Sequence, residues 1–372
     1  MKILMINSVC GIRSTGRICT DMADRFMSEG HECRIAYGRE SVPKQYESIS
    51  YRIGDEWQVK WNGIKARVFD NEGLNAKRST KVFLQWATAY DPDLLWLHNL
   101  HGYYLNYELL FEWIKSRPQM QVRWTLHDCW SFTGHCAHFS FVGCQQWQVG
   151  CARCSQTNEY PKSIGISCCK KNYFRKQHAF CGVSDMTLIT PSNWLAGLVK
   201  QSFLKEYSVE VVHNRIDEKI FRPTYGDFRE KHGLQNQKIV LGVASVWGER
   251  KGLSDFVKLA ELLETEYTIV LVGVDKVTAK RLPSSIVCIS RTNSKEELAE
   301  IYTTADVFVN LTYEDTYPTV NLEAQACGTP CLTYKTGGSV ESVPPENVVE
   351  QGDLAEMVAK IRGACGDKSE KL

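Results

Sequence analysis

The segment YEDTYPTVNLEAQACGTPCLTY, residues 313–334, directly follows an apolar run, VFVNL, at residues 307–311. The run is typical of a buried parallel strand, and the polar residues after it indicate a loop. Pro318 suits the first turn of a helix, where the missing N–H group of proline costs nothing. CGTP at residues 327–330 ends that helix, and CLTY is the next strand. The segment is therefore predicted to fold as strand, loop, helix and strand.

Two carboxylates stand at informative places in this segment. Asp315 lies in the predicted loop, and Glu323 lies eight positions later in the predicted helix. At the carboxyl edge of a parallel sheet, a loop and a helix start form a ligand cleft. Free amide groups at the start of the helix would bind a diphosphate, and the carboxylates would bind sugar hydroxyls. The segment therefore predicts a site for a nucleotide sugar.

The rest of the chain alternates apolar strands with longer helical patterns, which predicts parallel α/β sheets. One such series covers residues 1–216 and a second covers residues 238–352. The polar stretch between them, residues 217–237, contains proline and glycine and is the predicted linker. The predicted fold class is α/β, with two Rossmann-like, doubly wound domains that face each other across a cleft.

These residues resemble a known family. The spacing Asp315-x7-Glu323, followed by ACGTP, is similar to the acidic-x7-Glu signature of the retaining GT-B glycosyltransferases of family 4 (glycosyl transferases group 1). Further motifs resemble that family in the correct order along the chain: GR at 16–17, HD at 127–128, TPSNW at 190–194, VVHNRID at 211–217 and GERKG at 248–252. The resemblance covers most of the chain. It implies the GT-B fold, in which the last helix, within residues 353–372, packs back on the first domain.

A glycosyl donor carries a diphosphate leaving group whose negative charge grows as the anomeric bond breaks, so its site needs fixed cations and backbone amides. Lys251 and Arg250 meet that need, and Arg250 would replace an arginine that the family carries at the place of Val246. A solvated pair of cations at a helix start is the alternative. The resemblance implies further contacts to the donor from the loop and the helix after it: Asp315, Thr316, Tyr317, Thr319, Val320 and Glu323.

Within that set, Glu323 would accept hydroxyls of the ribose, and Asp315 would accept hydroxyls of the sugar. Lys251 and Asp315 are also predicted to be catalytic. The alternatives are an ordinary acidic residue in the first turn of a helix for Asp315 and an exposed helical carboxylate for Glu323. Asp315 stands where the family usually has glutamate, and Pro318 stands where glycine is common.

The first domain is predicted to supply the other side of the site. His127 ends a predicted strand, and by resemblance it would be catalytic, bonding to the donor sugar and orienting the reacting carbon. Asn99 and His101 end the neighbouring strand and would lie near the acceptor. Gly16 would let the donor phosphate or the acceptor approach the backbone. The alternatives are capping histidines for His127 and His101 and a plain tight turn around Gly16.

A cysteine-rich insertion is predicted at about residues 129–160. It contains Cys136, Cys144, Cys151 and Cys154, a spacing that ends in CxxC and is compatible with a structural zinc tetrahedron. Free thiols in an exposed loop are the alternative.

Composition limits the partners. The formal net charge of +1 over 372 residues gives no basic field for a nucleic acid. The apolar opening, residues 1–6, is too short for a signal peptide, and no later stretch approaches membrane-spanning length. A cytoplasmic chain with mostly free thiols is therefore expected. A lipid-linked acceptor would bring it to the inner face of the membrane as a peripheral protein, with residues 197–205 as a weak candidate for the contact.

The leading interpretation is an enzyme, a retaining glycosyltransferase. It would move a sugar from a nucleotide-diphosphate-sugar donor to a glycan or lipid-linked glycan acceptor in polysaccharide biosynthesis. The resemblance implies same-face attack, in which a phosphate oxygen takes the proton of the acceptor, so that no protein nucleophile and no cofactor is required for catalysis. Two alternatives stay open: a nucleotide-sugar 2-epimerase of the same fold, and a non-catalytic homologue that binds a glycan or a nucleotide sugar.

Overall fold

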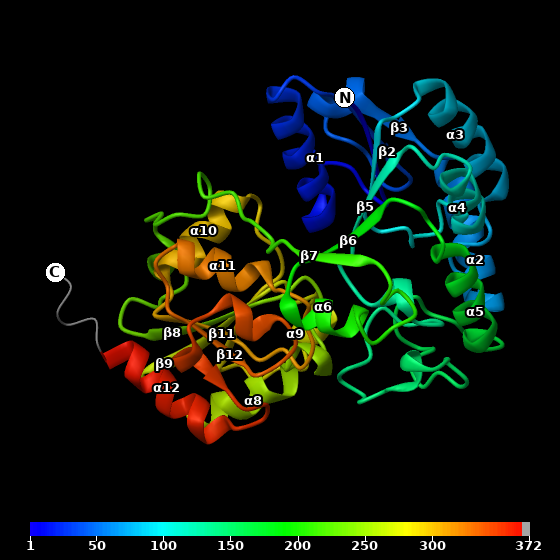
Figure 1. Ribbon diagram of the computed structural model, residues 1–372. Coiled ribbons are helices and arrows are strands. Elements are labelled where there is room, and N and C mark those ends of the chain that lie inside the picture. The colour runs from blue at the N-terminus through cyan, green and yellow to red at the C-terminus, as the bar shows by residue number, and fades with distance from the viewer. Residues whose placement is uncertain (367–372) are drawn as a thin grey trace. The chain divides into compact units, whose positions relative to one another are not determined.

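The computed structural model describes residues 1–366, which form two compact domains (Figure 1). The first domain covers residues 1–212, and the second begins at His213, close to the predicted boundary after residue 216. Each domain is built on one parallel sheet with connecting helices. The α/β fold class predicted from the alternation of strands and helices is confirmed.

The first domain contains a seven-stranded parallel sheet with the order β3-β2-β1-β4-β5-β6-β7. Its strands are β1 (Lys2–Asn7), β2 (Glu32–Tyr37), β3 (Ser50–Arg52), β4 (Leu94–Leu97), β5 (Gln121–Thr125), β6 (Met186–Thr190) and β7 (Ser208–Val211). Its helices are α1 (Arg13–Ser28), α2 (Glu56–Phe69), α3 (Lys77–Tyr90), α4 (Tyr107–Lys115), α5 (Cys169–Phe180) and α6 (Asn193–Val199). The strand order reverses between β1 and β4, and open α/β sheets bind ligands beyond the carboxyl ends of the strands at such a reversal.

The second domain repeats this plan with a six-stranded parallel sheet in the order β10-β9-β8-β11-β12-β13. Its strands are β8 (Lys238–Val243), β9 (Tyr267–Val272), β10 (Ile286–Ile289), β11 (Val307–Asn310), β12 (Cys331–Tyr334) and β13 (Val348–Val349). Its helices are α7 (Phe228–Lys231), α8 (Leu253–Leu262), α9 (Lys276–Ala279), α10 (Lys295–Thr304), α11 (Thr319–Ala326) and α12 (Leu354–Gly366). The order reverses between β8 and β11, so this domain has its own switch point.

Both faces of each sheet are buried, which explains the unbroken apolar strands. In β1, Leu4 and Ile6 belong to one hydrophobic core, and Ile3 and Met5 belong to a second core on the opposite face. Among residues 1–366, no helix has both the length and the apolar character required to cross a bilayer.

The predicted linker at residues 217–237 is part of the second domain. Phe221, Phe228 and Leu234 are buried in one of its two cores, against α10 and β8. The polar composition of the stretch conceals these three anchors, because they are spaced seven and six residues apart without a helical or strand period. The stretch predicted as a linker therefore packs with the second domain.

The C-terminal helix α12 also contributes to the second domain. Met357 and Ile361 are fully buried in the core that includes β11, β12 and α8. The predicted contact of this helix with the first domain stays a prediction, and the last six residues of the predicted segment, 367–372, lie outside the described residues.

The cysteine-rich insertion lies between β5 and α5 and contains two short 3₁₀ helices, η2 (Trp130–Phe132) and η3 (Gln146–Gln148). Four of its aromatic side chains join the core of the first domain: Trp130, Phe132, Phe139 and Trp147. Within this group Phe139 stacks on Trp147 with ring centroids 4.9 Å apart. Packing therefore explains these four aromatic residues, whereas Phe141 is exposed.

Candidate active site

The switch point of the second domain brings Lys251 and Asp315 together. Lys251 lies in a 3₁₀ turn, η4 (Glu249–Lys251), after β8, and Asp315 lies in the loop after β11. Gly252, which follows the turn, has a φ of +70°, and a Cβ atom at this position would lie 2.2 Å from the carbonyl oxygen of Leu311. Glycine is required there because no side chain fits between the two loops. The Tyr313 N–H group donates to the carbonyl of Arg250 at 2.9 Å, which fixes the loops against each other.

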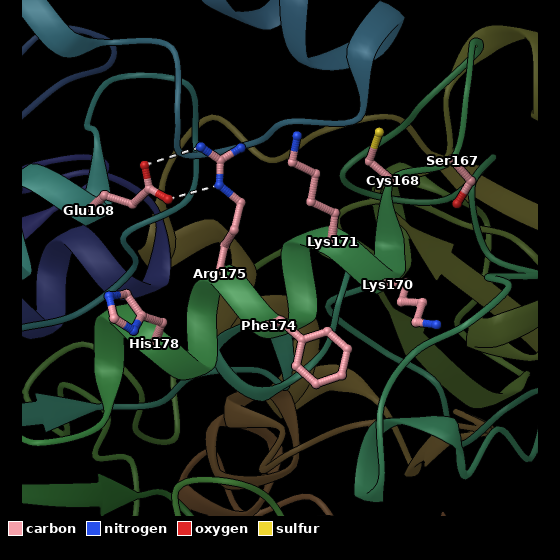
Figure 2. A pocket seen from close by; sticks show the side chains of 8 residues that line it. All are labelled: Glu108, Ser167, Cys168, Lys170, Lys171, Phe174, Arg175 and His178. Atoms are coloured by element: carbon pink, nitrogen blue, oxygen red, sulfur yellow. Dashed lines mark hydrogen bonds and ion pairs between the residues drawn. The ribbon is translucent and has the colours of Figure 1, made fainter.

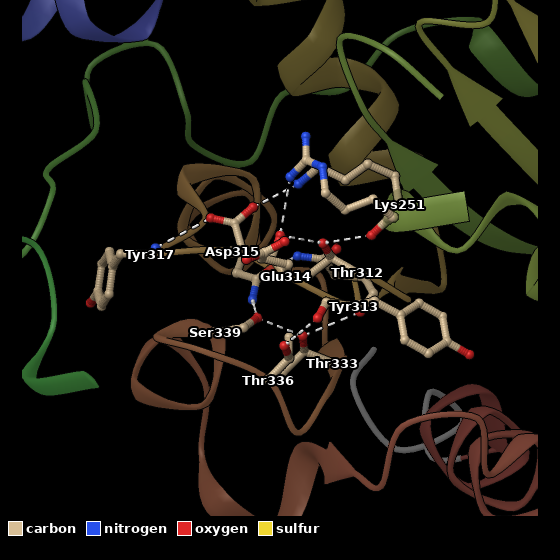
Figure 3. Close-up of polar contacts among 12 residues, drawn as sticks. Lys251, Thr312, Tyr313, Glu314, Asp315, Tyr317, Thr333, Thr336 and Ser339 are labelled. Carbon is tan, nitrogen blue, oxygen red and sulfur yellow. Dashed lines mark hydrogen bonds and ion pairs between the residues drawn. The ribbon is translucent and has the colours of Figure 1, made fainter. Parts of the chain in front are cut away.

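The ammonium of Lys251 and the carboxylate of Asp315 form an ion pair in this corner (Figure 3). Lys251 Nζ lies 2.6 Å from Asp315 Oδ2, and the two side chains are only 22% and 19% exposed. The second carboxylate oxygen accepts the Tyr317 N–H group at 3.2 Å. A cation and a carboxylate, 64 residues apart in sequence, are thus held at the carboxyl edge of the sheet, beside the start of α11.

The other residues predicted to bind the donor lie around this pair, and they differ in exposure and in hydrogen bonding within the protein. The guanidinium of Arg250 donates to the carbonyl of Glu314 at 3.3 Å, so it braces the loop that carries Asp315. Val246, where the family carries arginine, is exposed. The Tyr317 amide is already used by Asp315, and Thr316 is buried.

The first turn of α11 begins at Thr319 and Val320, and its N-cap, Pro318, makes no side-chain cap. The first amides of a helix lack partners within the helix, so they suit an anion.

Glu323 lies in the second half of α11, and its carboxylate contacts Tyr302. Its Oε2 accepts the hydroxyl of the buried Tyr302, on α10, at 3.0 Å. Burial, together with the charge of Glu323, holds the pKa of Tyr302 well above its ordinary value, so the phenol stays a hydrogen-bond donor. The structure thus places Glu323 on the helix that follows the loop of Asp315 and orients it through Tyr302.

A buried polar network, which sequence reasoning missed, holds the start of α11. Asn321 is fully buried and accepts from Asn310 at 2.8 Å, at the end of β11. Its amide nitrogen donates to Ser339 at 3.1 Å and to Ser342 at 2.9 Å. The hydroxyl of Ser339 also bonds to Thr333, on β12, as Figure 3 shows. The network therefore joins two strand ends and the 3₁₀ turn η5 (Ser339–Ser342) to the helix that follows Asp315.

The first residues of the second domain reach the same loop. The imidazole of His213 stacks on the ring of Tyr317, with centroids 4.7 Å apart and an interplanar angle of 15°. Asn214 donates from its side chain to the Tyr317 carbonyl at 3.2 Å. In the sequence, the motif at residues 211–217 was recognised only by its resemblance to the family. These contacts were not predicted, because sequence spacing does not show which loop a distant residue meets.

In the first domain, His127 is paired with a second histidine. His98 Nδ1 and His127 Nε2 are 3.0 Å apart, and the two rings stack with centroids 5.3 Å apart. Burial lowers the pKa of His127 to about 4 and holds the pKa of His98 well below its ordinary value. Both rings are thus neutral at pH 7, and one donates its N–H to the other. Nε2 of the buried His98 has no hydrogen-bond partner among residues 1–366.

This pair gives a prediction for stability against pH. The pKa of His127 is about 4 in the folded chain and 6.5 ordinarily, so the unfolded chain binds more protons between these values. Stability should therefore fall as the pH falls from 6.5 to 4. Chemical denaturation of His127→Gln across this range is expected to show a shallower loss than the wild type, whereas His178→Gln, at an exposed histidine, should follow the wild type. Equal slopes for His127→Gln and the wild type would contradict the assigned pKa.

His101 is engaged by protein groups at both ring nitrogens. Nε2 lies 2.9 Å from Asp128 Oδ2, and Nδ1 lies 2.8 Å from the hydroxyl of Tyr160. Burial would raise the pKa of Asp128, but the charge and the hydrogen bond of His101 outweigh it and hold the pKa well below its usual range. His101 therefore ties the residue next to His127 to the cysteine-rich insertion, which is a positioning arrangement.

Asn99 and Gly16 both lie near the switch point of this sheet. Asn7, fully buried at the end of β1, accepts the Asn99 N–H group at 3.2 Å and donates to the carbonyl of Val9 at 2.9 Å. Gly16 lies inside the first turn of α1, and its carbonyl accepts the N–H of Gly11 at 3.0 Å. A Cβ atom at Gly16 would lie 3.0 Å from Val9, so the residue serves close packing of the loop as well.

The four cysteines predicted to bind zinc line one small pocket together with His135: Cys136, Cys144, Cys151 and Cys154. The Cys154 Sγ accepts the N–H of Gln156 at 3.4 Å, and the Cys151 Sγ accepts that of Gly134 at 3.2 Å. Across residues 1–366, however, no group of three or more His, Cys, Asp or Glu side chains is arranged to hold a metal ion. The structural zinc site stays a prediction.

The sequence matches a known family of proteins over part of its length. Residues 225–371, which lie in the second domain, match the family model of the glycosyl transferases group 1. Over 231 residues the chain is 25% identical to an Escherichia coli (strain K12) protein named as a colanic acid biosynthesis glycosyl transferase, WcaC, which covers 58% of this chain and 55% of that protein. It is 24% identical over 153 residues to the N-acetyl-alpha-D-glucosaminyl L-malate synthase of Bacillus anthracis, covering 39% of each. The chain thus matches about half or less of the length of these curated relatives.

Solved structures extend the likeness to the whole chain. Sucrose-phosphate synthase of Thermosynechococcus elongatus superimposes with a TM-score of 0.64 at 16% identity, covering 98% of this chain and 90% of that one. HepE of Anabaena, solved in complex with UDP-glucose, gives 0.63 at 15% identity, covering 99% and 90%. At these identities the likeness shows the fold, and that fold is GT-B, as predicted.

Proposed function

We propose that the chain is a retaining glycosyltransferase that moves a sugar from a nucleotide-diphosphate-sugar donor to a hydroxyl of a glycan or lipid-linked glycan in polysaccharide biosynthesis. The Lys251–Asp315 pair at the start of α11 carries the proposal. It sets a cation for a diphosphate next to a carboxylate for sugar hydroxyls, within the domain that matches the family. The UDP-glucose bound by HepE and the colanic acid biosynthesis named for WcaC support the donor class and the pathway class.

In the proposed reaction, Lys251 and the first amides of α11 stabilise the leaving diphosphate, whose charge grows in the transition state. Arg250 holds the loop that carries Asp315, and Asp315 accepts hydroxyls of the sugar. Glu323, oriented by Tyr302, accepts the hydroxyls of the ribose. His127, neutral at pH 7, bonds to the donor sugar. The cations of the chain itself serve the leaving group in this scheme.

Thermal unfolding with nucleoside diphosphates tests the donor site. A ligand that binds only the folded chain stabilises it by about 2.7 kcal/mol at a hundred times its Kd, which corresponds to a rise in Tm of about 5 to 10 °C for a domain of this size. We expect this rise with one of UDP, GDP and ADP, and its loss in Glu323→Ala. Glu261→Ala, at an exposed glutamate of α8, should keep the rise. No rise with any of the three nucleotides would contradict the proposal.

A further inference from the structure

Helix α2 exposes large apolar side chains, whereas an ordinary surface helix buries them against the core. The side chains of Trp57 and Trp61 are 73% and 60% exposed, and Ile64 and Val68 are exposed as well. These four residues, spaced by four, three and four positions, form one stripe along the helix. The opposite face buries the small residues Gly63 and Ala66, together with Asn62. The large apolar side chains of α2 therefore face away from the core.

The orientation of α2 is fixed at its first turn and along its buried face. Asp55 caps the first turn by accepting the N–H of Gln58 at 2.8 Å. Asn62 donates to the carbonyl of Tyr103 at 3.0 Å, and a Cβ atom at Gly63 would lie 3.3 Å from the ring of Tyr103. The helix cannot rotate to bury its stripe without breaking these contacts, so the apolar exposure is built into the fold.

Two more apolar residues are anchored at the end of the helix. The N–H of Ile164 donates to the carbonyl of Arg67 at 2.8 Å, and the hydroxyl of Ser163 donates to the same carbonyl at 3.1 Å. Ile164 and Ile166 are 69% and 77% exposed. The α2 apolar surface is defined here by six residues: Trp57, Trp61, Ile64, Val68, Ile164 and Ile166.

Basic side chains flank this surface. With about 3.6 residues per turn, Lys60 and Arg67 lie about 60° to 80° from Trp57 on one side of the helix, and Lys65 lies about 80° away on the other. All three are exposed, and Glu56 is the acidic residue of the helix, paired with Lys60 at 2.7 Å. The formal charge of the whole chain is only +1, so this positive excess is local.

The basic rim continues beyond the end of the helix. Asp70, which follows α2, accepts the N–H of Cys168 at 2.6 Å, and Cys168 lines an open groove of about 700 Å³ along α5. Figure 2 shows Lys170 and Lys171 of α5 along this groove, with the exposed ring of Phe174. Exposed basic side chains thus lie near exposed apolar ones on both α2 and α5.

We propose that the α2 apolar surface lies in the interfacial layer of a membrane that contains anionic phospholipid. Tryptophan prefers the interface, where its ring is apolar and its N–H stays hydrated, and lysine and arginine beside it contact lipid phosphates. A two-fold contact with a second copy fits less well, because it would bring the basic rim of one copy, with Lys60, Lys65 and Arg67, close to the basic rim of the other. A helix of 14 residues is too short to span a bilayer and lies in its plane.

Flotation of the full chain with vesicles tests the surface without donor or acceptor, so it can fail while the transfer reaction stands. Vesicles of phosphatidylcholine alone are compared with vesicles in which about a third of the lipid is phosphatidylglycerol. The wild type should bind the anionic vesicles, and Trp57→Ser/Trp61→Ser should bind about tenfold or more weakly, since both rings leave the interface. Lys60→Gln/Lys65→Gln should weaken binding to anionic vesicles and reduce its dependence on salt.

Tyr225→Ser/Val277→Ser is the matched control, because both residues are exposed in the second domain. It should bind as the wild type does. An unchanged Tm of the tryptophan variant shows that the fold is intact. Failure of the wild type to bind either vesicle type would overturn the proposal and indicate that a protein partner covers the surface. A wild-type dimer that dissociates in Trp57→Ser/Trp61→Ser would also overturn it and indicate that a second copy covers the surface.

Discussion

Lys251→Met is expected to lower the kcat/KM of sugar transfer by about 10²- to 10³-fold, the usual effect of losing one group that stabilises charge in the transition state. The ammonium lies at the carboxyl edge of the second sheet, 2.6 Å from Asp315, and its loop is fixed by Gly252. Methionine keeps the length of the side chain and removes the charge. Because the leaving diphosphate gains charge only as the anomeric bond breaks, the loss should appear mainly in kcat.

Lys335→Met is the matched control for this substitution. Lys335 lies 2.6 Å from Glu350, the same distance as in the active-site pair, but its side chain is 61% exposed. Exposed ion pairs contribute little, so the control should keep both activity and stability. If Lys251→Met retained more than about a tenth of the wild-type activity, Lys251 would not stabilise the leaving group as proposed.

Asn321→Leu is expected to lower the free energy of unfolding of the second domain by about 2 to 4 kcal/mol, because buried polar partners lose their bonds in a space of unchanged size. The amide of Asn310 loses its acceptor, and Ser339 and Ser342 lose a donor. The loop of Asp315 is held through this network, so binding of the nucleotide-sugar donor should weaken as well.

Denaturant titration of the two forms measures the change in stability. Asn293→Leu, at an exposed position of the same domain, provides the control and should change stability by less than about 0.5 kcal/mol. A loss of under about 1 kcal/mol in Asn321→Leu would show that the network does not support α11.

The sequence predicted the architecture well because both sheets are covered on both faces. The central strands, such as β4 (LLWL) and β11 (VFVN), are then short apolar runs, and their boundaries are visible without knowledge of their neighbours. The same logic failed at residues 217–237, where Phe221, Phe228 and Leu234 anchor a polar stretch through contacts with distant elements.

The candidate site also combines residues that the sequence predicted with contacts that it did not predict. Lys251 and Asp315 were predicted because each stands beside a strand end, and parallel strands bring their carboxyl ends to one edge. The pairing of His127 with His98, the stacking of His213 on Tyr317 and the network of Asn321 were not predicted. Each depends on which side chains meet across the fold, and no local pattern records that. The exposed face of α2 was missed too, whereas the candidate at residues 197–205 buries Val199, Ser202 and Leu204.

The ion pair between Lys251 and Asp315 has a consequence for selectivity. Lys251 already has a counter-charge in Asp315, so a simple anion such as inorganic phosphate must compete with that carboxylate and gains little. A nucleotide sugar offers a diphosphate to the lysine and hydroxyls to the aspartate at once. Each half of such a donor then compensates for the bond that the other half breaks. In the proposed reaction the ion pair therefore favours the intact nucleotide sugar over a separate diphosphate or a separate sugar.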